Sequence, residues 1–554
     1  IDYFNKSLAI GQYNQATKAD AYFWRGESNY RLDNFRQAGD NYRQYLEFAT
    51  DRNGQEYGLA LYNLGYTYFK QKNYANAQTW FTRFVDRGNV NERAMQADAY
   101  NRIGDCSFYD RRFEQARQDY ARAVEIDPSL GDYSLYQEAF VRGLQRDYNG
   151  KIQTLNRLIS DYPESQYMDD ALYEQGRAFV QMEDNANAIA RFNILVKKFP
   201  ESNVARRAAN EIGLLYYQDD KYPEAIQAYK QVIANYPGSE EARLAQRDLK
   251  SIYIDLNKVD EYANFASTIP GGANFDVNER DSLTYVAAER VYMRGEVNEA
   301  RNSFTRYLQT FPEGAFSLNA NFYIGLIDYT QKAYDSAAEH LDKVLEYPNN
   351  KYSEDAMLMS AEMAYTAKNY EKALNVYKQL KDKAASQERR QLAKTGVLRS
   401  AHMLGNGEEV ILAATDLLSD SKLSPELSNE AHYYRAKVYL DEGKTEGAMD
   451  DLKVLAADTR NVYGAEAKYK VAQIYFDAGQ TDKAEQEVLN YIEVSTPHTY
   501  WLARSFVLLA DVYMKLGRNL DAKQYLLSLK QNYQADDDIA GMIESRLEKL
   551  KVEN

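Results

Sequence analysis

The residues that could carry out chemistry are few in this sequence of 554 residues, and they lie far apart. The four histidines are His340, His402, His432 and His498. None of them stands in a metal-binding spacing such as H-E-x-x-H. The single cysteine, Cys106, cannot form an intramolecular disulfide and has no second thiol beside which a zinc site could be built. We therefore expect no metal site, and we interpret Cys106 as a small buried hydrophobic residue.

The catalytic patterns that can be found are incomplete. The segment from Gly405 to Val410 (GNGEEV) begins like a dinucleotide-binding loop, but it lacks the third glycine and a preceding strand. Neither G-x-x-x-x-G-K-[ST] nor G-x-S-x-G occurs. Acidic pairs such as Asp169-Asp170 are neighbours in sequence rather than carboxylates facing each other across a cleft. We predict that the protein is not an enzyme and uses no cofactor.

Tyrosine is the residue type whose abundance indicates a function. The chain has 49 tyrosines. Aromatic side chains supply a large contact area with little loss of conformational entropy, and they are enriched at binding hot spots. The chemistry that this composition favours is therefore binding rather than catalysis.

Charge and hydropathy exclude two classes of partner. The net charge is −15 and the sequence pI is about 5.1, so a nucleic-acid phosphate backbone is repelled. The mean hydropathy is −0.66, and no apolar run approaches the roughly 20 residues that span a bilayer. Residue 1 is Ile rather than Met, so we expect any signal peptide or lipid anchor to lie outside this sequence. Membrane association would need such an anchor.

A recurring pattern of aromatic and small residues must position these tyrosines. Its clearest copy consists of Tyr100, Ile103-Gly104, Phe108, Ala116, Tyr120, Ala123 and Pro128. Proline is scarce, at 10 residues, and the residues between the aromatics are mostly good helix formers. The pattern predicts pairs of helices.

Small residues mark the middle of the first helix in each copy, at spacings of 35 to 40 residues. The series is Gly26, Gly65, Gly104, Ala139, Gly176, Gly213, Lys250, Ala288, Gly325, Ala361, Gly396, Ala436, Ala472 and Ala510. A glycine in mid-helix costs about 1 kcal/mol relative to alanine. Its recurrence therefore predicts a close crossing with the second helix, where a larger side chain would force the two backbones apart.

This pattern resembles the tetratricopeptide repeat along essentially the whole chain. The resemblance implies an all-α fold, a right-handed superhelical α-solenoid of about fourteen helix-turn-helix repeats. The pattern is broken at Lys250 and again by the Pro270-Gly-Gly turn signal. We expect an N-terminal lobe (1–268) of about seven repeats, an irregular linker or loop (269–281), and a C-terminal lobe (282–554) of about seven repeats plus a capping helix. The break is either a hinge or a long loop within one continuous solenoid.

The resemblance also implies where partners bind. In this fold the first helix of each repeat lines a concave groove, chiefly through its second, fifth, ninth and twelfth places, the small marker being the eighth. The predicted groove residues are Phe23, Tyr30, Tyr62, Tyr66, Phe69, Phe108, Tyr136, Tyr173, Tyr217, Tyr285, Tyr292, Phe322, Tyr329 and Tyr365. Tyr62, Tyr66, Phe69 and Tyr136 are expected to gather at one pocket. The alternative is that these rings pack between neighbouring helices.

The family's Lys/Asn clamp for a C-terminal carboxylate is missing, because the fifth and ninth places hold pairs such as Phe23/Glu27 and Tyr62/Tyr66. Recognition of the chaperone-tail kind is therefore not expected. The resemblance instead implies a scaffold that holds a protein or peptide segment in its Tyr-rich groove.

Three aromatic-Pro-x-Ser joints, ending at Ser165, Ser202 and Ser239, resemble the bacterial envelope branch of the family, typified by outer-membrane assembly lipoproteins and Tol-Pal coordinators. That likeness implies a periplasmic or outer-membrane-associated location. The alternatives are a cytoplasmic adaptor and a protein that binds envelope glycan or another polymer in the same groove.

Overall fold

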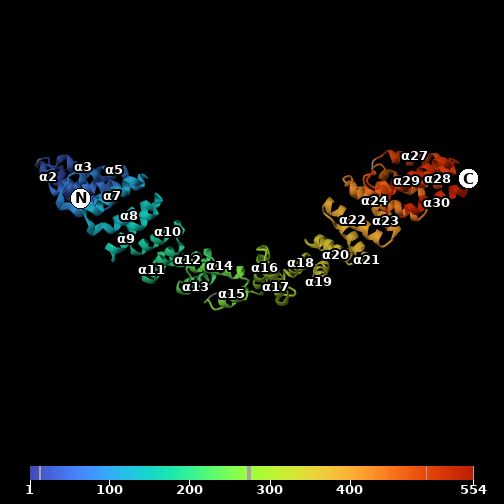
Figure 1. Cartoon of the computed structure of the whole chain (residues 1–554). Coiled ribbons are helices and arrows are strands. Elements are labelled where there is room, and N and C mark those ends of the chain that lie inside the picture. The colour runs from blue at the N-terminus through green and yellow to red at the C-terminus, as the bar shows by residue number, and fades with distance from the viewer. Residues whose placement is uncertain (12–13, 271–275, 348, 495, 553–554) are drawn as a thin grey trace. The chain divides into compact units, whose positions relative to one another are not determined.

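The computed structural model describes residues 1–11, 14–270, 276–347, 349–494 and 496–552. Within these residues the chain forms thirty α-helices and two short 3-10 turns, and no strand (Figure 1). The predicted all-α solenoid is thus confirmed.

The chain forms two compact units, Ile1–Ile269 and Pro270–Asn554. Residues 271–275 of the predicted 269–281 linker lie outside the described residues, and the first helix of the second unit begins at Val277. Whether the break acts as a hinge stays a prediction.

The first unit holds α1 to α15 and both 3-10 turns. Their bounds are α1 (Asp2–Ala9), α2 (Gln15–Arg31), α3 (Phe35–Phe48), α4 (Gln55–Lys70), α5 (Tyr74–Val85), η1 (Val90–Glu92), α6 (Arg93–Tyr109), α7 (Phe113–Ile126), η2 (Pro128–Leu130), α8 (Gly131–Leu144), α9 (Tyr148–Asp161), α10 (Met168–Gln181), α11 (Asn185–Lys198), α12 (Asn203–Gln218), α13 (Tyr222–Asn235), α14 (Glu240–Asp255) and α15 (Val259–Ala266).

The second unit holds α16 to α30. Their bounds are α16 (Val277–Met293), α17 (Val297–Thr310), α18 (Ser317–Thr330), α19 (Tyr334–Leu345), α20 (Ser353–Thr366), α21 (Tyr370–Lys383), α22 (Gln387–Met403), α23 (Gly407–Leu418), α24 (Pro425–Asp441), α25 (Thr445–Ala456), α26 (Val462–Asp477), α27 (Thr481–Glu493), α28 (Thr499–Lys515), α29 (Asn519–Asn532) and α30 (Ile539–Val552).

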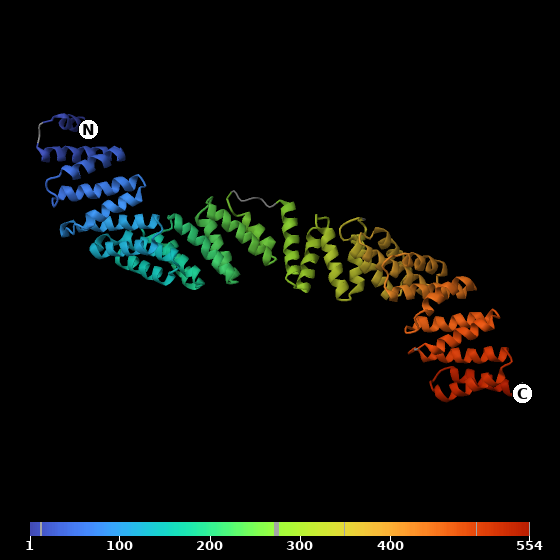
Figure 2. The same cartoon turned by 90° about the horizontal axis from the view of Figure 1, so that it is seen from above.

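Each even-numbered helix from α2 to α28 pairs with the odd-numbered helix that follows it, and each pair packs on the next within its unit (Figure 2). The described residues thus contain fourteen helical hairpins, seven in each unit. At the two ends of the chain, α1 packs on α2, and α30 packs on α28 and α29.

The aromatic-Pro-x-Ser joints precede the next first helix, and two of the three tie it to the preceding hairpin. Ser202 Oγ accepts a hydrogen bond from the Val204 amide (3.2 Å) and donates one to Asp169 Oδ2 (2.6 Å). Ser165 Oγ likewise donates to Asp132 Oδ2 (2.8 Å). A serine hydroxyl that caps a helix satisfies an otherwise unbonded backbone N–H. The joints therefore have a structural role in the stacking of repeats.

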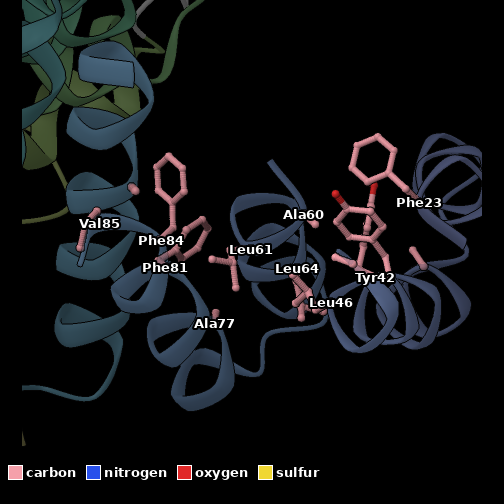
Figure 3. Packing of buried hydrophobic residues seen from close by; sticks show 14 of the residues in the cluster. Phe23, Tyr42, Leu46, Ala60, Leu61, Leu64, Ala77, Phe81, Phe84 and Val85 are labelled. Carbon is pink, nitrogen blue, oxygen red and sulfur yellow. The ribbon is translucent and has the colours of Figure 1, made fainter. Parts of the chain in front are cut away.

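A close crossing between a small and a large residue holds each hairpin together. A Cβ on Gly104 would lie 2.7 Å from the Tyr120 ring, and one on Gly213 would lie 2.6 Å from the Tyr229 ring. In every hairpin the partner stands sixteen residues after the marker. Figure 3 shows the resulting core of the first two hairpins, with Tyr42 beneath Phe23 and Phe81 beside Leu61.

One member of each of these fourteen pairs is glycine or alanine, and the other member is a larger apolar or aromatic residue in every pair except the seventh, where it is Lys250. The pairs are Gly26–Tyr42, Gly65–Phe81, Gly104–Tyr120, Ala139–Leu155, Gly176–Phe192, Gly213–Tyr229, Lys250–Ala266, Ala288–Phe304, Gly325–Leu341, Ala361–Tyr377, Leu398–Ala414, Ala436–Leu452, Ala472–Val488 and Ala510–Leu526.

The marker of the eleventh hairpin was wrong by two residues. In thirteen hairpins the residue with positive φ at the corner stands seven places after the marker, but Gly405 stands nine places after Gly396. Counting back seven places gives Leu398. Its partner Ala414 is fully buried, whereas Leu412, the partner expected for Gly396, is 59% exposed. In this hairpin the large residue lies on the first helix and the small one on the second, and the total volume is preserved.

The small–large crossing predicts coupled effects on stability. Gly176→Leu should destabilise its hairpin by about 1–3 kcal/mol because the new side chain overlaps the Phe192 ring. Phe192→Ala alone should cost about 3–5 kcal/mol through the cavity that it leaves. The double variant Gly176→Leu/Phe192→Ala reproduces the Leu398–Ala414 arrangement. Its loss of unfolding free energy should be smaller, by at least about 1 kcal/mol, than the sum of the losses in the two single variants. Urea titrations of the full chain measure the cycle, and strict additivity would contradict it.

The same substitution, glycine to alanine, should have opposite effects on stability at a hairpin corner and inside a helix. Gly443 has φ +72°, which an L-residue adopts only at a cost, so Gly443→Ala should destabilise the chain by about 1 kcal/mol. Gly541 lies in α30 with open space around the position of a Cβ. There the same change should stabilise by about 0.5 kcal/mol. Urea midpoints that shift in the same direction in both variants would refute the assignment.

Candidate partner-binding face

The predicted fifth-place rings connect one repeat to the next. The Tyr62 hydroxyl donates to Asp98 Oδ2 (2.7 Å), and the Tyr433 hydroxyl donates to Glu466 Oε2 (3.1 Å). In both cases the acceptor is the second place of the following repeat. The Tyr285 hydroxyl accepts from that place too, from Asn319 Nδ2 (3.3 Å). The second and fifth places of the expected groove are thus partly used for stacking the repeats.

Arginine at the second place makes the equivalent contact without a hydrogen bond from the ring. The Arg207 guanidinium lies 5.4 Å from the centroid of the Tyr173 ring, and that of Arg504 lies 5.2 Å from the Tyr469 ring. Fifth-place rings also stack on an aromatic residue just before the next first helix, such as Phe322 on Tyr352 (4.1 Å between centroids, 14° between planes). In these contacts the predicted groove rings pack between neighbouring helices, which is the alternative to partner binding given in the sequence analysis.

Most twelfth-place rings close the turn inside their own hairpin. Six of the seven predicted twelfth-place rings pack against the aromatic residue that opens the second helix, five residues later, at centroid distances of 5.2 to 6.1 Å. The seventh, Tyr292, is followed by Val297 and packs instead on Tyr323 (4.9 Å, 51°). The six pairs are Tyr30–Phe35, Phe69–Tyr74, Phe108–Phe113, Tyr217–Tyr222, Tyr329–Tyr334 and Tyr365–Tyr370. This aromatic-x4-aromatic spacing is present in the sequence and identifies these rings as turn residues.

Burial differs among the fourteen predicted groove residues. Those that are buried are Phe23, Tyr173, Tyr285 and Phe322. Those that are half-buried are Tyr30, Tyr62, Tyr66, Phe69, Phe108, Tyr136, Tyr217, Tyr292, Tyr329 and Tyr365. A buried ring contributes to the core and offers no free face, so a partner could contact only the half-buried group.

Four of the predicted residues meet at one hollow between α2 and α4, with a volume of ≈ 420 Å³. Its lining is Phe23, Trp24, Glu27, Tyr30, Arg31, Leu59, Tyr62, Asn63 and Tyr66. Phe69 and Tyr136, which were expected at the same pocket as Tyr62 and Tyr66, are not part of this lining. Tyr136 instead stacks on Tyr167 (5.2 Å, 14°).

Trp24 is the residue of this hollow that the sequence analysis missed. It occupies the sixth place, which the groove rule does not include, and its side chain is 53% exposed. Its ring lies perpendicular to that of the buried Phe23 (5.2 Å, 87°), and about half of the residue meets solvent. A large exposed ring on a rigid base is typical of a binding hot spot.

The polar floor of the hollow is internally satisfied. Glu27 accepts hydrogen bonds from Arg31 Nε (2.8 Å), the Tyr42 hydroxyl (2.9 Å) and Asn63 Nδ2 (3.3 Å). The carboxylate and the guanidinium form an ion pair, so the lining has no excess charge. Shape and aromatic surface, rather than charge, would determine what binds there.

Beside this hollow lies a buried polar network. Asp105 accepts from the Tyr120 and Tyr133 hydroxyls (both 2.8 Å) and pairs with Arg102 (2.6 Å). Burial raises the pKa of Asp105, and the Arg102 guanidinium opposes that rise. The Asp105 carboxylate is bound by side chains from three helices, and such a network fixes neighbouring helices in register.

Burial also raises the pKa of the predicted groove tyrosines for which a shift is resolved. They are Tyr30, Tyr62, Tyr66, Tyr136, Tyr173, Tyr285, Tyr329 and Tyr365. A hydroxyl with a raised pKa stays neutral at physiological pH. Among them, the hydroxyls of Tyr62, Tyr66, Tyr173, Tyr285 and Tyr329 donate hydrogen bonds to carboxylates.

Neither a metal-binding cluster nor a membrane-spanning helix is found within the described residues. No group of three or more histidine, cysteine, aspartate or glutamate side chains is arranged to hold a metal ion, and no helix combines the length and apolar character that crossing a bilayer requires. Cys106 is buried, and burial raises the pKa of its thiol to about 12.

Comparison with known proteins places repeats of one kind in this chain. Tetratricopeptide-repeat family profiles match residues 43–92, 62–130, 133–165, 173–240 and 503–530. No curated protein matches the sequence.

Solved structures that resemble the chain include that of Naa15/Naa10 bound to HypK-THB, which is 11% identical, with 97% of this chain and 79% of that chain covered and a TM-score of 0.35. Another is the TPR domain of P58(IPK), which is 13% identical, with 71% of this chain and 99% of that chain covered and a TM-score of 0.21. By its profile matches, its fourteen hairpins and its small–large crossings, this chain contains tetratricopeptide repeats in both of its units.

Proposed function

We propose that this protein is a non-catalytic scaffold that binds a segment of a partner protein, with the hollow between α2 and α4 as an anchor point. The observation that carries the proposal is Trp24, a half-exposed indole that lines that hollow and contacts the buried Phe23 ring. A bulky apolar side chain of a partner that entered the hollow would pack against Trp24 and the half-buried Tyr30, Tyr62 and Tyr66.

The state of the nearby acid–base groups supports a binding role rather than a catalytic one. Glu27 is bound by three neighbouring side chains. Asp98 accepts from both Tyr62 and Tyr66. A general base needs a lone pair directed at a substrate, whereas these carboxylates are directed at the protein's own donors.

We also propose that the protein acts in the bacterial cell envelope. The support is the resemblance of the three aromatic-Pro-x-Ser joints to envelope proteins of the family. Cell fractionation of the full-length gene product tests the location, and recovery in the cytosolic fraction would favour a cytoplasmic adaptor.

Trp24→Ala should weaken binding without unfolding the protein. Peptides selected from a random 12-residue display library on the immobilised full chain provide the probes. Calorimetric titration of a selected peptide should show an affinity at least about 10-fold lower for Trp24→Ala, because an exposed hot-spot ring contributes about 2 kcal/mol or more to binding. The matched control is Leu520→Ala, which removes a side chain that is 85% exposed in the second unit. Equal affinity for Trp24→Ala and the unchanged protein would contradict the anchor.

Tyr62→Ala combined with Tyr66→Ala should behave differently. Both rings pack against Phe81 (5.9 and 5.1 Å), and both hydroxyls bond Asp98. We expect a loss of stability of about 3 kcal/mol or more, on the scale of a core truncation, seen as a lower urea midpoint. If the midpoint did not move, these rings would be free surface for a partner.

The glycan-binding alternative has its own test. If the full chain bound glycans on an array and selected no peptides, that result would support the glycan-binding alternative.

A further inference from the structure

The second unit contains a hollow of its own on the first-helix face, with a volume of ≈ 440 Å³. It lies among α20, α21, α22 and α24. Its lining is Glu362, Tyr365, Tyr377, Glu388, Gln391, Leu392, Thr395, Gly396, Arg399 and Leu427. Among the predicted groove residues, only Tyr365 is part of it.

The corrected register of the eleventh hairpin explains why this space is open. With Leu398 as the eighth place, the fifth place is Thr395, where eight other repeats carry a phenylalanine or tyrosine ring. The next residue is Gly396, whose missing side chain lets the Tyr377 ring of α21 approach α22. Both this repeat and the one before it, with Leu358, lack a ring at the fifth place, and the hollow lies between their first helices.

The charges around this hollow do not balance. Glu362 accepts only the hydroxyl of Tyr329, and among the described residues no cation pairs with Glu362 or with the exposed Glu388. Arg399 is bound in a bidentate manner by Glu430 (Nε and Nη2, both 2.8 Å), which neutralises it. Two carboxylates thus carry uncompensated negative charge at the rim.

The other cations of α22 are engaged elsewhere. Arg389 Nη2 donates to Asp355 Oδ1 (2.7 Å), and Arg390 Nη2 donates to the Ala384 carbonyl (2.7 Å). Lys394 is held by Asp416 and Asp420 (2.9 and 2.6 Å). Each of these cations is held by its own acceptor rather than by Glu362 or Glu388.

We propose that this hollow is a second binding site, which receives an arginine or lysine side chain from a protein segment. The cationic head would lie between Glu362 and Glu388, and the methylene stem would pack against Tyr365 and Leu392. Arginine should be preferred to lysine, because its planar guanidinium can bond a carboxylate in a bidentate manner and stack on a tyrosine ring. The inference rests on the proposed scaffold function and adds the chemistry of the partner.

Labelled peptides of the sequence Gly-Ser-Leu-Xaa-Leu-Ser-Gly test the site by fluorescence anisotropy with the full chain. The residue Xaa is arginine, lysine, glutamine or glutamate. The arginine peptide should bind at least about 5-fold tighter than the glutamine peptide, and the glutamate peptide should bind most weakly. Raising the salt from about 50 mM to about 500 mM should reduce the difference, because screening weakens exposed charge pairs.

Two variants with the same change in charge locate the site. E362Q combined with E388Q should remove the preference for arginine over glutamine, since an amide keeps the shape but loses the charge. E446Q combined with D450N neutralises two exposed acids elsewhere in the second unit, and should leave the preference intact. Equal binding of all four peptides, or a preference that survives E362Q/E388Q, would overturn the proposal.

The result is separable from the test of the first hollow. Trp24→Ala changes the first unit only, so it should leave the ratio of arginine to glutamine affinity unaltered. If Trp24→Ala has no effect on the display-selected peptides while E362Q/E388Q removes the arginine preference, the first anchor is wrong and the second site stands. The opposite pair of results overturns the second site and retains the scaffold.

Discussion

The fold depends on the distance at which the two helices of a hairpin cross. One residue of each pair, sixteen residues apart, is glycine or alanine in all fourteen hairpins described, and where it is glycine the side chain of its partner fills the space that it leaves. This crossing fixes the hairpin geometry. The corner with positive φ then falls seven residues after the first member, and the twelfth-place ring comes to rest on the residue that opens the second helix.

The stacking of hairpins uses most of the aromatic surface that could have bound a partner. Tyr62 and Tyr433 donate to carboxylates of the next repeat, and Phe322 stacks on a ring just before it. Free surface remains where a residue departs from this arrangement. Trp24 stands one place beyond the row, and Thr395 leaves a gap in it. Both binding sites that we propose therefore lie at irregularities of the repeat rather than along its regular face.

Much of the fold could be predicted from the sequence, because the crossing residues recur at a nearly constant spacing and the second helix follows at a fixed offset. The eleventh hairpin could not, since Gly396 has the expected residue type two positions from the true crossing, and only the burial of Leu398 and Ala414 reveals the exchange of large and small. The groove was predicted less well. A tyrosine that binds a partner and one that bonds Asp98 have the same spacing in sequence, so only the contacts of each side chain separate the two roles.

The exchange of large and small at Leu398 and Ala414 has a consequence for how such arrays evolve. Recombination that moved α22 alone into another hairpin would place a leucine against a phenylalanine or tyrosine, and moving α23 alone would leave alanine against glycine with an empty space. Duplication or exchange of a whole hairpin carries both members together. The unit that is inherited intact is therefore the helix pair with its internal corner. Recombination breakpoints should be tolerated between hairpins and selected against within them.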